Sequence, residues 1–490
     1  MGTAQHERDA RERTTDEHVW TRMRIPDLGT ESRRCLSPIR EIGGSCGLAL
    51  RIRVYPLSSV VPLLLAAAIL SLCGSVSAQT DYARNQYSTN VLAPPDYETF
   101  RPPAAGNTFR CPVFGTEILV LTDDHSIIGF NGERSNFSQD DNLFFVGAKP
   151  PGGSKETRLY DGRTGAFIKA LPIPGSDNLR WSYHPKTLVE LRANQLIGHD
   201  VVTGKERVIK EFREPLGNGK GRVCGGDGHD FDDKGEWILL EFGAGFKRLF
   251  AYNIRTGRKG REFALPQSER HRVDYATISP SGQYVVANGG LHGPKKWTGA
   301  GLYRRDGRFL RHLGAGGHCE FGYLNGTGES CIMKAGKGRD EWRKKWDVDV
   351  RERYAVQFSD GKVVSLSLPG SIFAQYSAVG GSNRRYLYLA TESDGMLPNK
   401  GWNRYHGEII EIPLDGSKKV RRLLHHRARP DESKRKWKWG HHTWEDQPEL
   451  WVNHAGDRLF FRSNMCLKKG TTGQRYGHDL FMIKIPPRRH

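Results

Sequence analysis

Short apolar strands alternate with polar turns along most of the chain, and one arrangement of them keeps returning. A short strand is followed by a turn of Asp, Pro, Asn, Ser and Gly residues and then by a second apolar strand. The copies are SNFSQDDNLFFVG at 135–147, RWSYHPKTLVEL at 180–191, GHDFDDKGEWILLEF at 228–242, DYATISPSGQYVVANG at 274–289, GHCEFGYLNGTGESCIM at 317–333, QYSAVGGSNRRYLYLA at 375–390 and WEDQPELWVNHAGDRLFFRSN at 444–464. A further strand and turn, such as RLYDGRTGA or LFAYNIRTGR, follows each copy. Outside a basic run at 336–346 no window sustains a helical period, so the pattern predicts an all-β protein.

The repeat predicts a β-propeller, because units of roughly 45–70 residues with about four strands each fit the blades of that fold. The last unit ends in DLFMIKI at 479–485 with no fourth strand after it, whereas an unpartnered strand, TEILVLT at 116–122, precedes the first unit. We therefore expect a seven-bladed β-propeller over 116–490, closed by pairing of these two strands. Residues 79–115 are then a lead-in segment.

The N-terminal region has the form of a secretory signal peptide at residues 51–78. Arginines at 51 and 53 precede an apolar run of 13 residues at 60–72 and the small-residue end Val-Ser-Ala. The run is shorter than the about 20 residues that a membrane-spanning helix needs. A lipid anchor at Cys73 is the alternative, although bulky Leu72 stands where such anchors take a small residue. We expect cleavage after Ala78 and a secreted or periplasmic protein. Residues 1–50 are either an unstructured extension or the product of a start site assigned too early.

The chain is basic, with a net charge of +19, and removing residues 1–78 leaves 64 Lys and Arg against 47 Asp and Glu. Such a balance indicates an anionic partner. Nucleic acid is disfavoured by the expected export and the even spread of charge, so an acidic polysaccharide or oligosaccharide is the expected partner of a monomeric protein without stable membrane insertion. A basic surface that is merely well solvated is the alternative.

Cysteine gives little information about function. Five cysteines follow residue 78, at positions 111, 224, 319, 331 and 466, and none has the CxxC spacing of a zinc site. Cys319 and Cys331 flank a predicted hairpin turn, so they can form a disulfide if the two strands place them opposite each other.

Three stretches resemble a known group of proteins: the opening TEILVLTDD, the SPSG turn and the ending HAGDRLFFRSN. They resemble the seven-bladed propellers of the TolB-like and oligogalacturonate-lyase-like group, over residues 116–486. That group includes secreted lyases of pectin fragments and of ulvan. The resemblance implies the propeller fold and makes a lyase the expected class of enzyme.

Polar and aromatic residues precede or begin the innermost strands of the predicted blades, so we expect them to gather at one mouth of the central channel. The candidates for proton transfer are His229, Tyr275, His318 and Tyr376. The candidates for substrate binding are Arg180, Arg272, His292, Arg404, His442 and Trp444. These candidates also have structural alternatives. Histidines can form hydrogen bonds with the backbone in Gly-rich turns, and tyrosines can pack in a channel. Arg272 can form an ion pair with Asp274.

These residue types suit the cleavage of a uronate-containing polysaccharide by β-elimination. The proton next to the sugar carboxylate is weakly acidic until a cation such as Arg neutralises that carboxylate. A His or Tyr then removes the proton, and another protonates the leaving oxygen. Trp444 can stack on a sugar ring.

Other chemistries are less well represented. The resemblance implies a divalent ion held by histidines before the last inner strand, but Gln447 and Glu449 stand there. They are weak candidates for Ca²⁺ or Mn²⁺, and we expect no required cofactor. Glu320 and Glu445 are a conceivable pair for glycoside hydrolysis. The main alternative to a lyase is a non-catalytic propeller that binds a glycan or a protein partner at the same mouth.

Overall fold

A computed structural model of the protein describes the greater part of one compact unit, Ala78–His490. The described residues are 81–97, 99–128, 136–173, 179–216, 231–243, 245–296, 298–314, 319–334, 353–366, 374–380, 384–391, 402, 404–428, 448–465 and 477–488. The predicted extension at 1–50 and signal peptide at 51–78 lie outside them and remain predictions.

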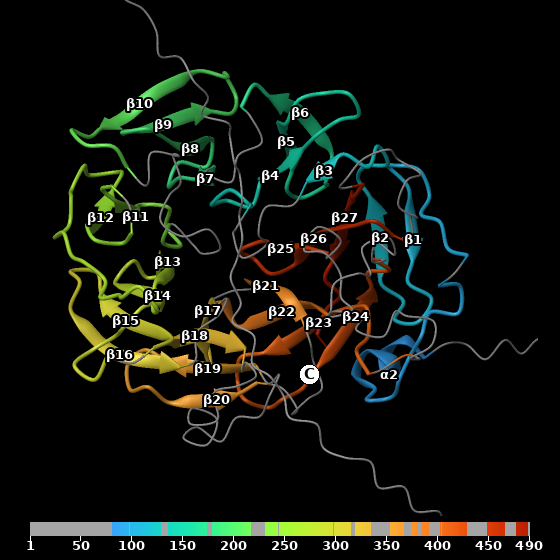
Figure 1. Cartoon of the computed structure of the whole chain (residues 1–490). Helices are drawn as coiled ribbons and strands as arrows, with labels where there is room; N and C mark the ends of the chain where they lie inside the picture. Colours follow the sequence, from blue (N-terminus) through green and yellow to red (C-terminus); the bar gives the residue numbers. More distant parts are fainter. Residues whose placement is uncertain are drawn as a thin grey trace, which may run out of the picture. The chain divides into compact units, whose positions relative to one another are not determined.

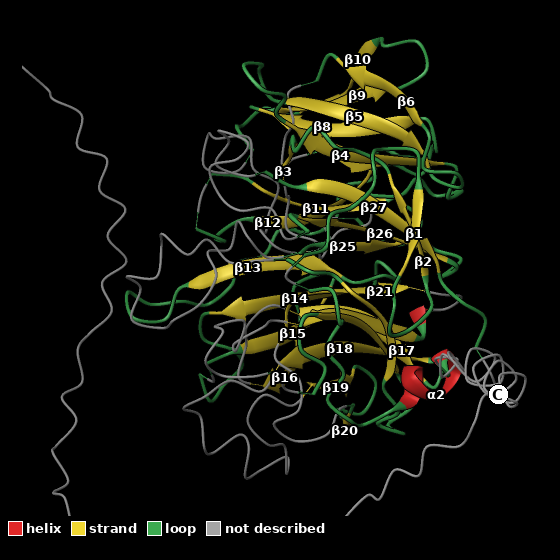
Figure 2. Ribbon diagram, turned by 90° about the vertical axis from the view of Figure 1, so that its right-hand side faces the viewer, coloured by secondary structure: helices red, strands yellow, loops and turns green. Residues whose placement is uncertain are grey.

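Nearly all the described elements are antiparallel β-strands, and α2 (Tyr82–Tyr87) is the helix among them (Figures 1 and 2). Five sheets have four strands each. They are β3 (Ile127–Ile128), β4 (Leu143–Ala148), β5 (Glu156–Asp161) and β6 (Phe167–Leu171); β7 (Arg180–Trp181), β8 (Thr187–Arg192), β9 (Gln195–Asp200) and β10 (Glu206–Glu211); β13 (Val273–Ile278), β14 (Tyr284–Gly289), β15 (Ala300–Arg304) and β16 (Phe309–Gly314); β17 (Cys319–Leu324), β18 (Gly328–Lys334), β19 (Arg353–Gln357) and β20 (Val363–Ser365); and β21 (Ala374–Gly380), β22 (Tyr386–Thr391), β23 (Glu408–Pro413) and β24 (Arg421–His425).

Two further sheets differ from this plan. The closing sheet has five strands, in the order β1 (Thr108–Arg110), β2 (Glu117–Val120), β27 (Asp479–Lys484), β26 (Arg458–Ser463) and β25 (Leu450–Val452). The other sheet has two named strands, β11 (Trp237–Glu241) and β12 (Leu249–Asn253). Isolated bridges lie on both sides of it, Phe231 with Ile238 and Leu249 with Phe263.

The sheets surround a common axis, which makes the fold a β-propeller (Figure 1). The first strands of neighbouring sheets touch each other, as β17 touches β21 and β21 touches β25. The closing sheet joins the two ends of the unit, because β2 pairs with β27 through Leu119 opposite Met482 and Val120 opposite Phe481. The predicted pairing of 116–122 with 479–485 is therefore confirmed.

Each sheet has two ends. We call the end where the first strand begins the mouth end, and the end where the hairpin turn joins the first and second strands the turn end. In antiparallel sheets the second strand ends, and the third begins, at the mouth end.

Polar contacts tie different sheets together at the turn end. Ser281 donates its backbone N–H and its hydroxyl to Glu329 of the next sheet, at 3.0 and 2.7 Å. Arg384 pairs with Asp233, although their sheets are not consecutive in the chain. The turn end is therefore held by polar contacts between turns.

The core lies between the sheets. Where the closing sheet meets the β3–β6 sheet, the ring centroid of Phe144 lies 4.4 Å from that of Phe460 and 5.5 Å from that of Trp451. All three side chains are fully buried, and each such burial contributes about 1.5–3 kcal/mol. Packing between sheets thus reinforces the closure made by β2 and β27.

The possible disulfide between Cys319 and Cys331 does not form, and both side chains are buried. The register of β17 and β18 places Cys319 opposite Met333 and Cys331 opposite Phe321. The two cysteines are therefore two residue pairs apart along the hairpin, and a disulfide needs Cα atoms within about 7 Å.

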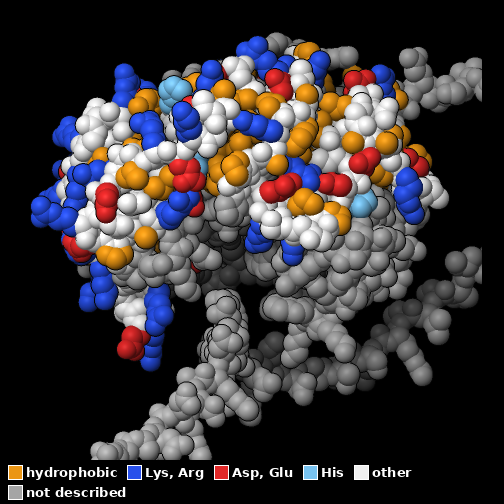
Figure 3. All heavy atoms as spheres, turned by 90° about the horizontal axis from the view of Figure 1, so that it is seen from above, with side chains coloured by type: hydrophobic (Ala, Val, Ile, Leu, Met, Phe, Trp, Pro, Cys, Tyr) orange, Lys and Arg blue, Asp and Glu red, His pale blue; other side chains and the backbone are white. Residues whose placement is uncertain are grey.

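The face seen in Figure 3 carries many Lys and Arg side chains among acidic and apolar ones. Among the described residues, no helix has both the length and the apolar character needed to cross a membrane.

Candidate functional site

A histidine held by a buried aspartate lies at the mouth end of the closing sheet. Asp479 begins β27, and His125 lies in the connection that leads from β2 to β3. The Nδ1 atom of His125 is 2.5 Å from Oδ2 of Asp479. The other oxygen, Oδ1, accepts hydrogen bonds from Oγ1 of Thr122 at 3.1 Å and from the backbone N–H of His125 at 2.9 Å. The carboxylate thus fixes the imidazole ring and the loop that carries it.

This histidine is the accessible member of the pair. The side chain of His125 is 27% exposed, whereas that of Asp479 is 4% exposed. The backbone of His125 has a φ of 52°, a left-handed conformation that only a few per cent of non-glycine residues adopt. A partly exposed imidazole oriented by a buried carboxylate is the usual arrangement of a general acid or base.

Nearby acidic groups favour the protonated form of His125. Its pKa is raised above 6.5, first by the hydrogen bond with Asp479 and then by the negative charges of Asp479, Asp124 and Asp123, which together outweigh partial burial. Asp124 is itself held by Arg158, whose Nη1 lies 2.8 Å from Oδ2. His125 therefore titrates above the ordinary range of a histidine.

A buried ion pair adjoins this histidine–aspartate pair along the chain. Nη2 of Arg462, on β26, donates to Oε1 of Glu449 at 3.1 Å, and both side chains are 3% exposed. Nη1 of Arg462 lies 3.5 Å from Nδ1 of the buried His478, which directly precedes Asp479. Five titratable groups thus lie at the mouth end of one sheet, at residues 449, 462, 478, 479 and 125.

Two of the residues predicted from the sequence are structural. The hydroxyl of Tyr275, which is 2% exposed, donates to Sγ of Cys319 at 3.2 Å and accepts from the backbone N–H of Cys319 at 3.0 Å. His292 is fully buried, with Nδ1 at 2.7 Å from the hydroxyl of Tyr303 and Nε2 at 2.9 Å from the carbonyl of Gly299. Burial lowers the pKa of His292. Both rings therefore stabilise the packing of their sheets.

The predicted arginines are separate from one another. Arg180 begins β7, is 7% exposed, and donates to the carbonyl of Leu179 at 2.7 Å. Arg272 is exposed just before β13, and Arg404 is exposed in the turn before β23. Arg272 keeps the accessibility that carboxylate binding requires, whereas Arg180 is largely enclosed by protein.

Several predicted residues lie outside the described part of the chain. They are His229, His318, His442, Trp444 and Gln447. The backbone of Tyr376 belongs to β21, but its side chain is not described. Their roles remain predictions.

Glu449 does not fit the role of a metal ligand. Its carboxylate is buried, and Oε1 accepts a hydrogen bond from the guanidinium of Arg462 at 3.1 Å, so this oxygen already has a cation of the chain as its partner. Among the described residues, no group of three or more His, Cys, Asp or Glu side chains is placed to hold a metal ion.

The position of His125 in the sequence is one that could have selected it as a candidate. The same rule that selected Arg180 and Arg272, a polar residue just before a first strand, also selects His125, two residues before β3. The prediction missed it because β3 was expected near 135, in front of LFFVG.

Comparisons with known proteins support the fold. No family model matches the chain, and no curated protein matches its sequence significantly. An oligogalacturonate lyase in complex with manganese is similar in structure, with a TM-score of 0.52 and 13% identity over 78% of this chain and 99% of that chain. An oligogalacturonate lyase from Vibrio parahaemolyticus gives the same TM-score of 0.52 and 13% identity, over 78% and 96%. At this identity the likeness shows the β-propeller fold, and activity has to be argued from the site.

Proposed function

We propose that the protein is a polysaccharide lyase that cleaves an acidic, uronate-containing polysaccharide by β-elimination at the mouth end of the propeller. The observation that carries the proposal is the partly exposed His125, held 2.5 Å from the buried Asp479. The place of this pair supports the proposal, because His125 lies at the mouth end beside the buried Arg462–Glu449 ion pair, where the substrate is expected to bind. The similar fold of the oligogalacturonate lyases supports the choice of reaction.

In this mechanism His125 is the group that exchanges a proton with the sugar. Above its raised pKa the neutral ring removes the proton next to the sugar carboxylate, and Asp479 stabilises the imidazolium that forms. The electron pair released from the C–H bond forms the double bond of the unsaturated sugar as the bond to the leaving oxygen breaks. The exposed Arg272 is the proposed partner of the sugar carboxylate, in a bidentate contact. His229 and His318 remain candidates for protonating the leaving oxygen.

The experiment is to incubate the purified protein with a panel of acidic polysaccharides, including polygalacturonate, alginate and ulvan, and to follow ultraviolet absorbance of unsaturated ends. We expect product from at least one of them. Ala substitution of His229 or His318 should lower turnover about 10²–10⁴-fold if that residue transfers a proton. Arg272→Ala should impair both substrate binding and turnover. Arg272→Lys should retain only part of the parent's binding and turnover, because an ammonium cannot form the bidentate contact.

A parent protein that leaves every polysaccharide intact would overturn the lyase proposal. Retention of the protein on one of these polysaccharides without cleavage would then favour the alternative, a propeller that binds a glycan.

We further propose that the ring has seven blades, the two-stranded β11–β12 sheet being one of them. The bridges beside it, made by Phe231 and Phe263, lie where a first and a fourth strand belong. A second support is a backbone hydrogen bond that recurs at the turn end of all seven sheets. It runs from Gly162 to Asn142, Val201 to Lys186, Ile254 to Glu236, Arg305 to Gln283, Phe358 to Glu329, Leu414 to Arg385 and Ile485 to Asp457.

Export is also part of the proposal, because extracellular polysaccharide is the expected substrate. The mature chain should begin near Gln79, which the intact mass of exported protein tests. A soluble exported chain that still carries the apolar run at 60–72 would contradict cleavage at Ala78.

A further inference from the structure

The segment that precedes the ring covers buried charged residues of the β21–β24 sheet. We call residues 81–97 the N-terminal strap. Arg422 donates from Nη1 to the strap carbonyls of Ser88 and Asn90, at 3.2 and 2.8 Å. Arg427 donates from Nη2 to Oδ1 of Asp96 at 2.5 Å. The strap is thus fastened by arginines whose own side chains are almost fully buried.

Beneath the strap a cysteine, a histidine and a glutamate are aligned. Sγ of Cys111 lies 4.0 Å from Nδ1 of His425. On the opposite side of the ring, Nε2 lies 2.9 Å from the strap carbonyl of Leu92 and 3.5 Å from Oε1 of Glu408. The ring of Phe114 stacks on the imidazole, with centroids 4.9 Å apart. A nucleophile facing one nitrogen, with oxygens fixing the other, is the general arrangement of an activated thiol.

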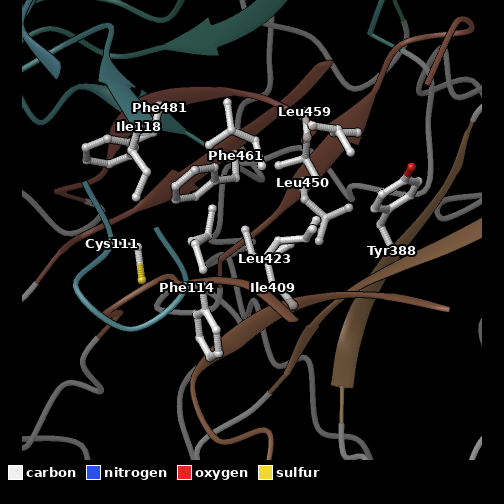
Figure 4. Close-up of a cluster of buried hydrophobic side chains, with 14 of the residues drawn as sticks. Cys111, Phe114, Ile118, Tyr388, Ile409, Leu423, Leu450, Leu459, Phe461 and Phe481 are labelled. Carbon is white, nitrogen blue, oxygen red and sulfur yellow. The ribbon is translucent and has the colours of Figure 1, made fainter. Parts of the chain in front are cut away.

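The electrostatics favour a thiolate paired with an imidazolium. Burial alone would raise the pKa of Cys111, but the hydrogen bond and charge of His425 outweigh it and the pKa is lowered. Burial would lower the pKa of His425, but Cys111 and Glu408 raise it to about 9. Glu408 is in turn held by Arg422, at 2.8 and 2.5 Å. Figure 4 shows Cys111 at the edge of the apolar cluster that includes Phe114 and Leu423.

Two other cysteines of the described chain, Cys319 and Cys331, have different surroundings. Cys319 is 2% exposed, like Cys111, but its sulfur accepts a hydrogen bond from the hydroxyl of Tyr275. Cys331 is fully buried in an apolar cluster with Phe321. They match Cys111 in burial, and the sulfur of Cys319 has a tyrosine hydroxyl where that of Cys111 has a histidine, so both serve as internal controls.

We propose that Cys111 is a site of thiol–disulfide exchange with small disulfides, reached when the N-terminal strap lifts. The Cys111 thiolate attacks one sulfur of the disulfide, a mixed disulfide forms, and the original S–S bond breaks. The departing thiolate leaves with the electron pair of that bond and takes the proton of the His425 imidazolium. Cys111 is thereby oxidised to the disulfide level, and half of the reagent is reduced to a thiol. This site is independent of the chemistry proposed for the mouth end.

The test uses the full folded chain and dithiodipyridine, with labelled cysteines located by mass spectrometry at pH 6 and pH 8. We expect Cys111 to react about tenfold or more faster than Cys319 and Cys331 at pH 6, where an ordinary thiol is almost entirely protonated. Its rate should rise less steeply between the two pH values than the rates of the control cysteines, because the pKa of Cys111 is lowered. If Cys111 is labelled no faster than the controls, or only after the protein unfolds, then it is an ordinary buried thiol. Either result would overturn the proposal.

Two variants separate access from activation. Asp96→Asn removes the ion pair between the strap and Arg427, and should speed labelling of Cys111 several-fold without changing Cys319 or Cys331. His425→Gln should slow labelling of Cys111 at pH 6 and give it the steep pH dependence of an ordinary thiol. If His425→Gln fails to fold, the comparison of the three cysteines in the parent protein decides.

Discussion

Two histidine–aspartate pairs stand at opposite ends of the sheets, and their geometry is nearly the same. At the mouth end, Nδ1 of His125 lies 2.5 Å from Asp479, and at the turn end Nδ1 of His454 lies 2.7 Å from Asp141. The two histidine side chains are 27% and 29% exposed. Residue types, distance and exposure therefore do not distinguish a functional pair from a structural one.

The place of each carboxylate in the ring makes the distinction. Asp141 also accepts the backbone N–H groups of His454 and Ala455, both at 2.8 Å, so one carboxylate binds a whole turn of the closing sheet. That arrangement clamps two sheets together. Asp479 instead fixes the loop of His125 beside the buried Arg462 and Glu449. The comparison teaches that position in the ring, more than the pair itself, indicates function.

The largest expected effect comes from replacing the two aspartates with asparagine. Asp479→Asn should lower turnover about 10²–10⁴-fold, because the imidazole loses its orienting negative charge. Asp141→Asn should leave turnover unchanged and lower the free energy of unfolding by about 1–3 kcal/mol, since bonds to a charged acceptor are weakened. Initial rates and urea unfolding measure the two quantities. Equal loss of turnover in both variants would break the comparison.

The next largest effect is a pH dependence of the free energy of unfolding that arises from a carboxyl group at the turn end. Burial raises the pKa of Asp232 from 3.8 to about 6, against the backbone N–H groups of Trp237 and Glu236. Folding thus favours the protonated form, so the free energy of unfolding should be highest below pH 3.8, fall as the pH rises to about 6, and then stay level. Asp232→Asn should remove this decline. The measurement is urea unfolding from about pH 3.5 to about pH 7, and an unchanged decline in the variant would exclude Asp232 as its cause.

A smaller effect is the pH dependence of stability that arises from His125 at the mouth end. Because the pKa of His125 is raised above 6.5 in the folded protein, its pairing with Asp479 stabilises the fold fully below pH 6.5. This contribution should be lost as the pH rises through the folded pKa. The difference in Tm between the parent and His125→Gln should shrink from about pH 6 to about pH 9. A difference that grows with pH would contradict the sign.

The fold was more predictable than the site, because strands and turns are local patterns whereas side-chain partners are not. The unpartnered strand at 116–122 was enough to predict the closure with β27. Tyr275 was assigned to proton transfer because sequence does not show that its hydroxyl reaches Cys319 on the next sheet. The pairing of Glu449 with Arg462 joins residues near β25 and on β26, and only the register of these strands reveals it.

The central claim is that the chemistry belongs to the mouth end, and His125→Ala compared with His454→Ala tests it most directly. The measurement is the initial rate of unsaturated-end formation from the acidic polysaccharide that the parent cleaves best, at equal concentrations of folded protein. We predict a rate about 10²–10⁴-fold lower for His125→Ala and a rate near that of the parent for His454→Ala. Equal rates in the two variants would contradict the account.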